Sequence, residues 1–445
     1  MEDPEKKSPS PSSSPSPSPS PSQINSRKSE LKSESESESE SDSAELRRFE
    51  SFLKWICIMD HSNPFTATLS CFLFSAFAIA VPIASHFALS CSDCDEDHRR
   101  PFHVVVQLSL SAVATLSFGC LSAWLRHFGL SRFLFLDKLC ESSHKARDEY
   151  SKQLKRSMEL ISFFLLPCFM AEAAYKIWWY VSAAYEIPYY GNMYLSYITS
   201  CTLELFSWLY RTSIFFFVCI LFRLVCRLQM IRLEDFVSVF HRESDVGTIL
   251  MQHLGLRRTL TIISHRFRVF MFLSLILVTA SQFIFLLMTT RSHALANLSK
   301  TGQLALCSIS LVTGLFICLR SAAKISHKAQ SITCLAAKWH VSAAINTFDD
   351  LDNETPTTSV IATFEFNSDD DEDDDEDDED DMKLMPVFAH TISFQKRQAL
   401  VTYLRNNKAG ITVYGFVVDR TWLKSVFAIE LALVLWLLNK TVGIS

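Results

Sequence analysis

Two pairs of oppositely charged residues lie inside apolar stretches of this sequence. Glu172 and Lys176 are four residues apart, the spacing at which a glutamate and a lysine pair on one helix face. Glu204 and Arg211 are seven residues apart, about two helical turns, and so share a face. Charges in such surroundings face protein or water rather than lipid. The pairs therefore predict either a polar network that fixes helix packing or a hydrated ligand cavity or ion path.

A fifth ionisable residue, Glu430, lies within the last apolar stretch, from Trp422 to Leu438. A carboxyl group at that depth needs a polar neighbour, a water-filled path or a bound proton. Two interpretations remain open. Glu430 faces an axis shared with other subunits, where a ring of carboxylates would favour cations, or it meets Lys176 or Arg211 inside a single bundle.

No soluble-enzyme motif is present. The chain has only 10 glycines and none of the Walker, Rossmann, HExxH or GxSxG patterns. The segment Cys91–His98, CSDCDEDH, combines a CxxC with carboxylates and a histidine, but the second close pair of ligands that a zinc site needs is missing. We expect no enzyme activity, no catalytic residue, no metal, no cofactor and no nucleic-acid partner.

Seven apolar blocks are long enough to cross a membrane, which takes roughly 20 residues each. They lie at about 65–89, 102–124, 158–184, 194–222, 268–290, 302–319 and 422–440. The loops at about 126–156 and 223–268 are rich in Lys and Arg, and the short loop near residues 186–192 has none. By the positive-inside rule the sequence predicts an all-α, multi-pass protein of the plasma membrane or an endomembrane, with a cytosolic N-terminus and an extracytosolic C-terminus.

The remaining segments divide the chain. Residues 1–45 are rich in Ser, Pro and Glu and predict a disordered cytosolic tail. Residues 46–345 hold an interfacial helix near Arg47–Ile56 and spans one to six, with cytosolic helical loops. Residues 346–383 form a disordered acidic insert with an unbroken run from Asp369 to Asp381, and residues 384–445 add a cytosolic helix and span seven.

The closing block Gly410–Thr441, GITVYGFVVDRTWLKSVFAIELALVLWLLNKT, resembles that of a plant family of seven-span membrane proteins distantly related to insect gustatory and odorant receptors. The resemblance covers about residues 47–445, without the acidic insert. Its sharpest motif is Gly410–Arg420 together with Glu430. The Thr-Tyr and Gln-Phe signature of the insect receptors' last span is absent.

The insect resemblance implies a tetramer, a small ligand of unknown identity that reaches spans one to six, and a last helix that lines a central cation pore. The pore stripe would include Val426, Phe427, Glu430, Leu433, Val434 and Leu437. We therefore expect a chemoreceptor-like membrane protein, with a homo-oligomeric ligand-gated cation channel as the first hypothesis. The alternative is a non-conducting scaffold or signalling protein that recruits cytosolic partners through its tail and acidic insert.

Overall fold

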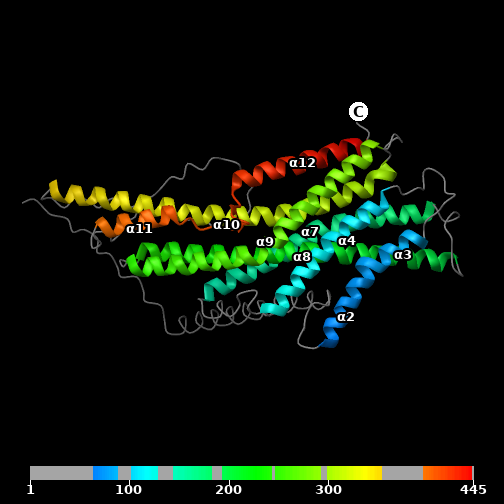
Figure 1. The fold of residues 1–445 in the computed structure, drawn as a ribbon, viewed down its shortest axis with the longest axis horizontal. Coiled ribbons are helices and arrows are strands. Elements are labelled where there is room, and N and C mark those ends of the chain that lie inside the picture. The colour runs from blue at the N-terminus through cyan, green and yellow to red at the C-terminus, as the bar shows by residue number, and fades with distance from the viewer. Residues whose placement is uncertain are drawn as a thin grey trace, which may run out of the picture. The chain divides into compact units, whose positions relative to one another are not determined.

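The structure is a computed structural model that describes residues 64–88, 102–128, 144–182, 193–242, 246–291, 298–352 and 394–442. The N-terminal tail, the helix expected near Arg47, the Cys91–His98 segment and residues 353–383 of the acidic insert lie outside these residues. The first part of the expected insert, 346–352, is the end of a long helix. The helices are α2 (Pro64–Ser75), η1 (Ala76–Ala80), α3 (Val81–Ala88), α4 (His103–Phe128), α7 (His144–Ser182), α8 (Met193–Arg242), α9 (Val246–Arg291), α10 (Leu298–Asp352), α11 (Phe394–Asn406) and α12 (Arg420–Val442) (Figure 1). The prediction of an all-α protein is confirmed, apart from one short hairpin of β1 (Thr412–Val413) and β2 (Phe416–Val417).

Six helices in the described residues are long and apolar enough to cross a membrane. Their apolar parts are Ala67–Phe87, His103–Arg126, Lys155–Val181, Tyr194–Val237, Val246–Met288 and Gly302–Val341. The chain is therefore a helical, multi-pass membrane protein. The seventh expected span, α12, is 23 residues long and is not among these six.

Three helices continue far beyond the spans that the sequence predicts. α8, α9 and α10 have 50, 46 and 55 residues. At about 1.5 Å per residue each is about 70–80 Å long, more than twice the ~30 Å of a hydrocarbon layer. Residues 223–242 contain no Gly or Pro, so nothing in the chain stops α8 where its apolar run ends. Residues 324–344 likewise continue α10 without a break.

α8 lies at the centre of the helical packing. It contacts α3, α4, α7, α9 and α10, and every residue from Tyr210 to Phe222 is buried. It packs tightly on α10 at Gly314, where an added Cβ would lie 2.3 Å from the ring of Phe215. Glycine is therefore needed at this crossing, because any side chain would displace a buried aromatic ring.

The first membrane helix contains one π-helical turn just before Pro82. The N–H of Val81 donates to the carbonyl of Ala76, five residues back. Pro82 has no N–H, so the carbonyls of Phe77 and Ala78 lose the donor that the next turn normally supplies. Hydroxyl groups from other helices replace it: Ser207 Oγ donates to Phe77 O at 2.6 Å, and Ser111 Oγ donates to Ala78 O at 2.7 Å. The bulge thereby ties this helix to α4 and α8.

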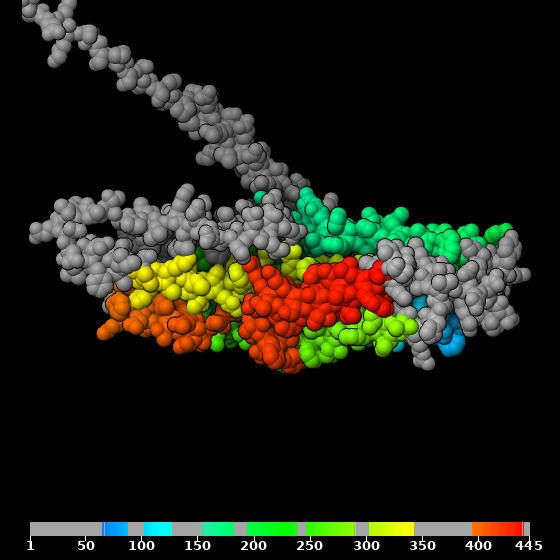
Figure 2. Space-filling model, turned by 90° about the horizontal axis from the view of Figure 1, so that it is seen from above, coloured from blue at the N-terminus to red at the C-terminus, as the bar shows by residue number. Residues whose placement is uncertain are grey.

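The C-terminal part folds back onto α9 and α10. α11 packs on both helices, the β1–β2 hairpin contacts α9, and α12 then runs along α9 and α10. Figure 2 shows the red α12 lying against the yellow α10 and the light-green α9.

Candidate functional site: a buried polar core beside an apolar cavity

Lys176 of α7 lies between two carboxylates in the membrane part of the protein. Its Nζ atom is 3.7 Å from Oε1 of Glu172, one turn away on the same helix, and 3.1 Å from Oε2 of Glu204 on α8. All three side chains are almost completely buried. The i,i+4 spacing explains the first contact, and the close packing of α7 on α8 brings in the second.

Two neutral side chains complete this cluster. Ser85 of α3 donates its hydroxyl to Oε1 of Glu204, and Nε2 of Gln303 on α10 donates to Oε1 of Glu172 at 2.9 Å. The cluster thus joins α3, α7, α8 and α10. Because a buried carboxylate is stable only when paired and hydrogen-bonded, these contacts hold four helices at one level.

Arg211 lies two turns further along α8 and supplies the second positive charge. Its Nε donates to Ser207 O at 3.1 Å, and its Nη1 donates to Gln107 O at 3.3 Å and to Ser111 Oγ at 3.1 Å. Glu172 and Glu204 lie close enough to act on it electrostatically. Two acids and two bases therefore make a buried group that is neutral overall, the arrangement that costs least in a membrane.

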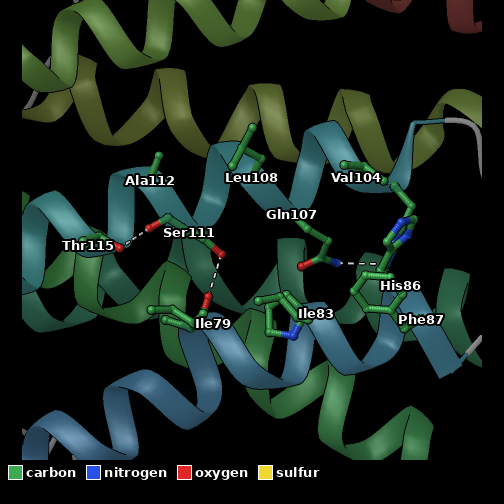
Figure 3. A pocket seen from close by; sticks show the side chains of 13 residues that line it. Ile79, Ile83, His86, Phe87, Val104, Gln107, Leu108, Ser111, Ala112 and Thr115 are labelled. Carbon is green, nitrogen blue, oxygen red and sulfur yellow. Dashed lines mark hydrogen bonds between the residues drawn. The ribbon is translucent and has the colours of Figure 1, made fainter.

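A cavity of about 380 Å³ lies between the first membrane helix and α4 (Figure 3). Its walls are mainly apolar, with Ile79 and Ile83 on one side and Leu108 on the other. Gln107 and Ser111 also line it. The backbone carbonyl of Gln107 and the hydroxyl of Ser111 accept the hydrogen bonds from Arg211. The cavity wall and the charged cluster are therefore connected through a single guanidinium group.

Gln107 carries an unsatisfied polar atom at this cavity. Its Nε2 is 3.2 Å from Nε2 of His103, but its Oε1 is buried and has no hydrogen-bond partner among the described residues. The side chain as a whole is only 6% exposed. A buried amide oxygen without a donor is costly, so this atom is suited to accept a hydrogen bond from a molecule in the cavity.

Glu430, Phe427 and Val434 lie on the face of α12 that packs against the rest of the chain. Glu430 is 2% exposed, and its Oε1 accepts a hydrogen bond of 2.5 Å from Thr279 of α9. Its Oε2 has no hydrogen-bond partner, and no salt bridge reaches it within the described residues. Phe427 packs on Phe316 of α10, with ring centroids 4.4 Å apart, and Val434 is buried.

The structure thus brings together the four charged residues of the two pairs singled out from the sequence. Glu172, Lys176, Glu204 and Arg211 share one polar core, whereas Glu430, Phe427 and Val434 lie at the α9–α10–α12 interface. Sequence reasoning missed the uncharged partners, which are Ser85, Gln107, Ser111, Ser207, Thr279 and Gln303. These residues could have been found in the sequence as hydroxyl or amide side chains within apolar spans. Such side chains commonly form hydrogen bonds between membrane helices.

A family model with the description "Protein of unknown function (DUF3537)" matches residues 44–429. The chain belongs to this family. The match covers the whole polar core, the cavity and the start of α12 as far as Ile429, so all of these are features of a DUF3537 chain. No curated protein and no solved structure matches the chain. The comparisons therefore give no support to the insect-receptor resemblance or to a plant origin.

Proposed function

We propose that this chain is a membrane receptor of the chemoreceptor type, in which a small amphipathic molecule binds in the cavity between α3 and α4. The observation that carries the proposal is the position of Arg211. It contacts the cavity wall at Gln107 and Ser111 and lies within electrostatic range of Glu172 and Glu204. A ligand that shifts α4 changes these contacts, so binding alters the polar core that holds α7, α8 and α10.

The ligand class follows from the cavity lining. Apolar walls fit a hydrocarbon or aromatic body, and the free oxygen of Gln107 fits one hydrogen-bond donor. We therefore use 1-naphthol, a fluorescent aromatic alcohol, as the probe and 1-methoxynaphthalene as the matched compound without a donor. The purified full-length protein in nanodiscs is expected to bind 1-naphthol more tightly, by about 5–10-fold, the effect of about one hydrogen bond.

Substitutions in the cavity test this binding directly. Gln107→Leu should abolish the preference for the alcohol, and Ala112→Phe should fill the cavity and reduce the binding of both compounds. Ala123→Phe, at an exposed position of α4 outside the cavity, is the control and should bind as the unaltered protein does. Equal binding of the two probes by every variant would refute the proposed site.

We also propose that α12 is the seventh span. Basic residues mark one end of the apolar part of several helices: Arg126 on α4, Arg156 on α7, Arg223 on α8, Arg268 on α9, Arg320 on α10 and Lys424 on α12. By the positive-inside rule this end is cytosolic, which places the N-terminus inside and the C-terminus outside. The extended ends of α8, α9 and α10, together with α11, are then a cytosolic helical bundle.

Ion conduction is the further step, and it rests on the insect resemblance. A homo-oligomer, a tetramer by that resemblance, would pass cations along α12. The stripe with Glu430 and Val434 packs on α9 and α10 within one chain. We therefore expect the opposite face, with Ala428, Ala432 and Leu435, to meet other subunits.

Currents through planar bilayers that contain the purified protein test conduction, with and without 1-naphthol. The channel proposal expects a cation current that Leu435→Glu, on the exposed face of α12, alters. The scaffold alternative expects no current, and loss of cellular function on deletion of residues 1–45 and 369–381 while Glu430→Gln is tolerated. If no current is seen, the channel proposal is wrong. The receptor proposal then depends on the binding assay alone.

A further inference from the structure

The β1–β2 hairpin is fixed rigidly at the point where α12 begins. The N–H groups of Ile411 and Thr412 donate to Ser326 Oγ on α10 and to Ser264 Oγ on α9, each at 3.0 Å. Tyr414 and Gly415 have φ values of 48° and 90°, which allow the tight two-residue turn. The backbone of the hairpin is therefore held by two helices, and its tip has a defined position.

The hairpin nevertheless exposes apolar side chains. Phe416 is 77% exposed, and Tyr414 and Val417 are also exposed. Trp422 follows in the first turn of α12 and is exposed as well. The hairpin and the start of α12, orange-red in colour, lie on the face that Figure 2 displays. A rigid element that presents aromatic rings to its surroundings is typical of a membrane interface or a binding surface.

Four basic residues lie on the helices next to this element, and we call them the basic collar: Arg268, Arg320, Arg420 and Lys424. The guanidinium of Arg268 lies 5.4 Å from the ring centroid of Tyr414. The guanidinium of Arg320 lies 5.9 Å from that of Phe316, whose ring packs on Phe427, one turn beyond Lys424. The collar therefore comes from α9, α10 and α12 together.

Basic residues outnumber acidic ones in the segment that forms the hairpin and the start of α12. Between Thr412 and Lys424 the chain has one acid, Asp419, whose carboxylate accepts the backbone N–H of Arg420 at 2.7 Å. His327 of α10 also lies near Asp419 and Arg420. Residues 412–424 thus carry a net positive charge beside exposed apolar side chains.

The collar also marks one edge of the apolar layer. Beyond Arg268, residues 269–290 of α9 carry no charge, residues 302–319 of α10 carry none before Arg320, and Glu430 is the one charge in residues 425–438 of α12. Lipid phosphate groups lie at such an edge, and Arg and Lys near an anionic leaflet are attracted to it.

We propose that the hairpin and the basic collar bind the headgroup of an anionic phospholipid in the cytosolic leaflet, a sidedness that rests on the orientation proposed above. The phosphate oxygens accept hydrogen bonds from Arg420 and Lys424, while Phe416 and Trp422 lie at the boundary of headgroup and acyl chain. A lipid supplies both an anion and an apolar chain at one place. An acidic peptide supplies only the anion, so it leaves Phe416 uncovered.

Native mass spectrometry of the full-length protein in detergent tests the proposal with phosphatidylserine and phosphatidylcholine as probes. The unaltered protein is expected to prefer phosphatidylserine. Neutralising one collar residue should reduce this preference about fivefold, and the double variant Arg420→Gln/Lys424→Gln should reduce it about 25-fold if the two act independently. Arg405→Gln/Lys408→Gln, the same loss of charge at exposed positions in and after α11, is the matched control.

Three outcomes would overturn the proposal. The first is that the collar variant keeps its preference for phosphatidylserine. The second is that the α11 control loses as much of this preference as the collar variant, which would mean that the overall charge of the protein and not the collar attracts the lipid. The third is that deletion of residues 369–381 raises the affinity for phosphatidylserine in the unaltered protein but not in the collar variant. The acidic run, and not a lipid, would then be bound to the collar. The lipid measurement needs neither a cavity ligand nor a current. The lipid proposal can therefore fail while the proposed function holds, and the proposed function can fail while the lipid proposal holds.

Discussion

The ammonium group of Lys176 on α7 lies 3.1 Å from the carboxylate of Glu204 on α8, and both are buried in the membrane part of the protein. A carboxylate oxygen of Glu172 lies 3.7 Å from the same ammonium group. One lysine therefore compensates two carboxylates, and Arg211 supplies the charge that makes the group neutral. The stability of the helix packing should depend on each member of this group.

Replacing Lys176 with Met should destabilise the protein by about 3–5 kcal/mol, because two buried carboxylates lose their counter-charge. The free energy of unfolding in detergent micelles measures this effect. The double variant Lys176→Met/Glu204→Gln should lose markedly less, since one of the orphaned charges is gone. Lys155→Met, at an exposed position of the same helix, is the control and should change stability by no more than about 0.5 kcal/mol. Equal costs for the single and double variants would contradict a functioning ion pair.

Ser207→Ala should cost about 1–3 kcal/mol, because the carbonyl of Phe77 then lacks a donor at the π-helical turn. The same substitution should cost less in a Pro82→Ala background, where the new N–H can serve a carbonyl of the preceding turn. A double-mutant cycle on unfolding free energies measures this coupling. Ser162→Ala, whose exposed hydroxyl bonds a carbonyl of its own helix, is the control. A coupling free energy of zero would show that the hydrogen bond from Ser207 does not depend on Pro82.

The sequence predicts the membrane helices well, because the length of each apolar run matches the thickness of the hydrocarbon layer that the helix crosses. It also predicts that Glu172 and Lys176 share a face, since their spacing is local. It does not predict that Glu204 joins Lys176 while Arg211 turns to Gln107 and Ser111, because those contacts depend on how α4, α7 and α8 cross.

The extended helices were missed for a related reason. Apolar periodicity ends where the membrane ends, but the backbone stays helical as long as the following residues favour helix. α8 has no Gly or Pro between Arg223 and Arg242, so the predicted boundary at 222 is a membrane boundary and not a helix end. The direction in which Glu430 points likewise depends on how α12 is rotated against α9 and α10. The sequence therefore left open both a shared axis and a partner inside the bundle, and did not indicate Thr279.

Gly314→Ala should destabilise the α8–α10 crossing by about 1–3 kcal/mol, because the new methyl group would overlap the buried ring of Phe215. Gly119→Ala on α4 is the matched control: nothing lies within 4 Å of its Cβ position. That substitution should be neutral or stabilising by up to about 1 kcal/mol, since alanine favours helix over glycine. Thermal unfolding in micelles compares the two. If Gly314→Ala were as stable as Gly119→Ala, the helices would not approach as closely as described.

Two leucines of α12 distinguish the face that packs within the chain from the face that points away from it. Leu437 is 2% exposed and Leu435 is 55% exposed. Leu437→Ala should reduce the free energy of unfolding of the monomer by about 2–5 kcal/mol through the cavity it leaves, whereas Leu435→Ala should change it by less than about 0.5 kcal/mol. If the exposed face meets other subunits, Leu435→Ala should instead shift the mass distribution of the detergent-solubilised particle toward monomer, which light scattering measures. A destabilised monomer with Leu435→Ala and an unaffected one with Leu437→Ala would mean that α12 is rotated the other way and that Glu430 faces outward.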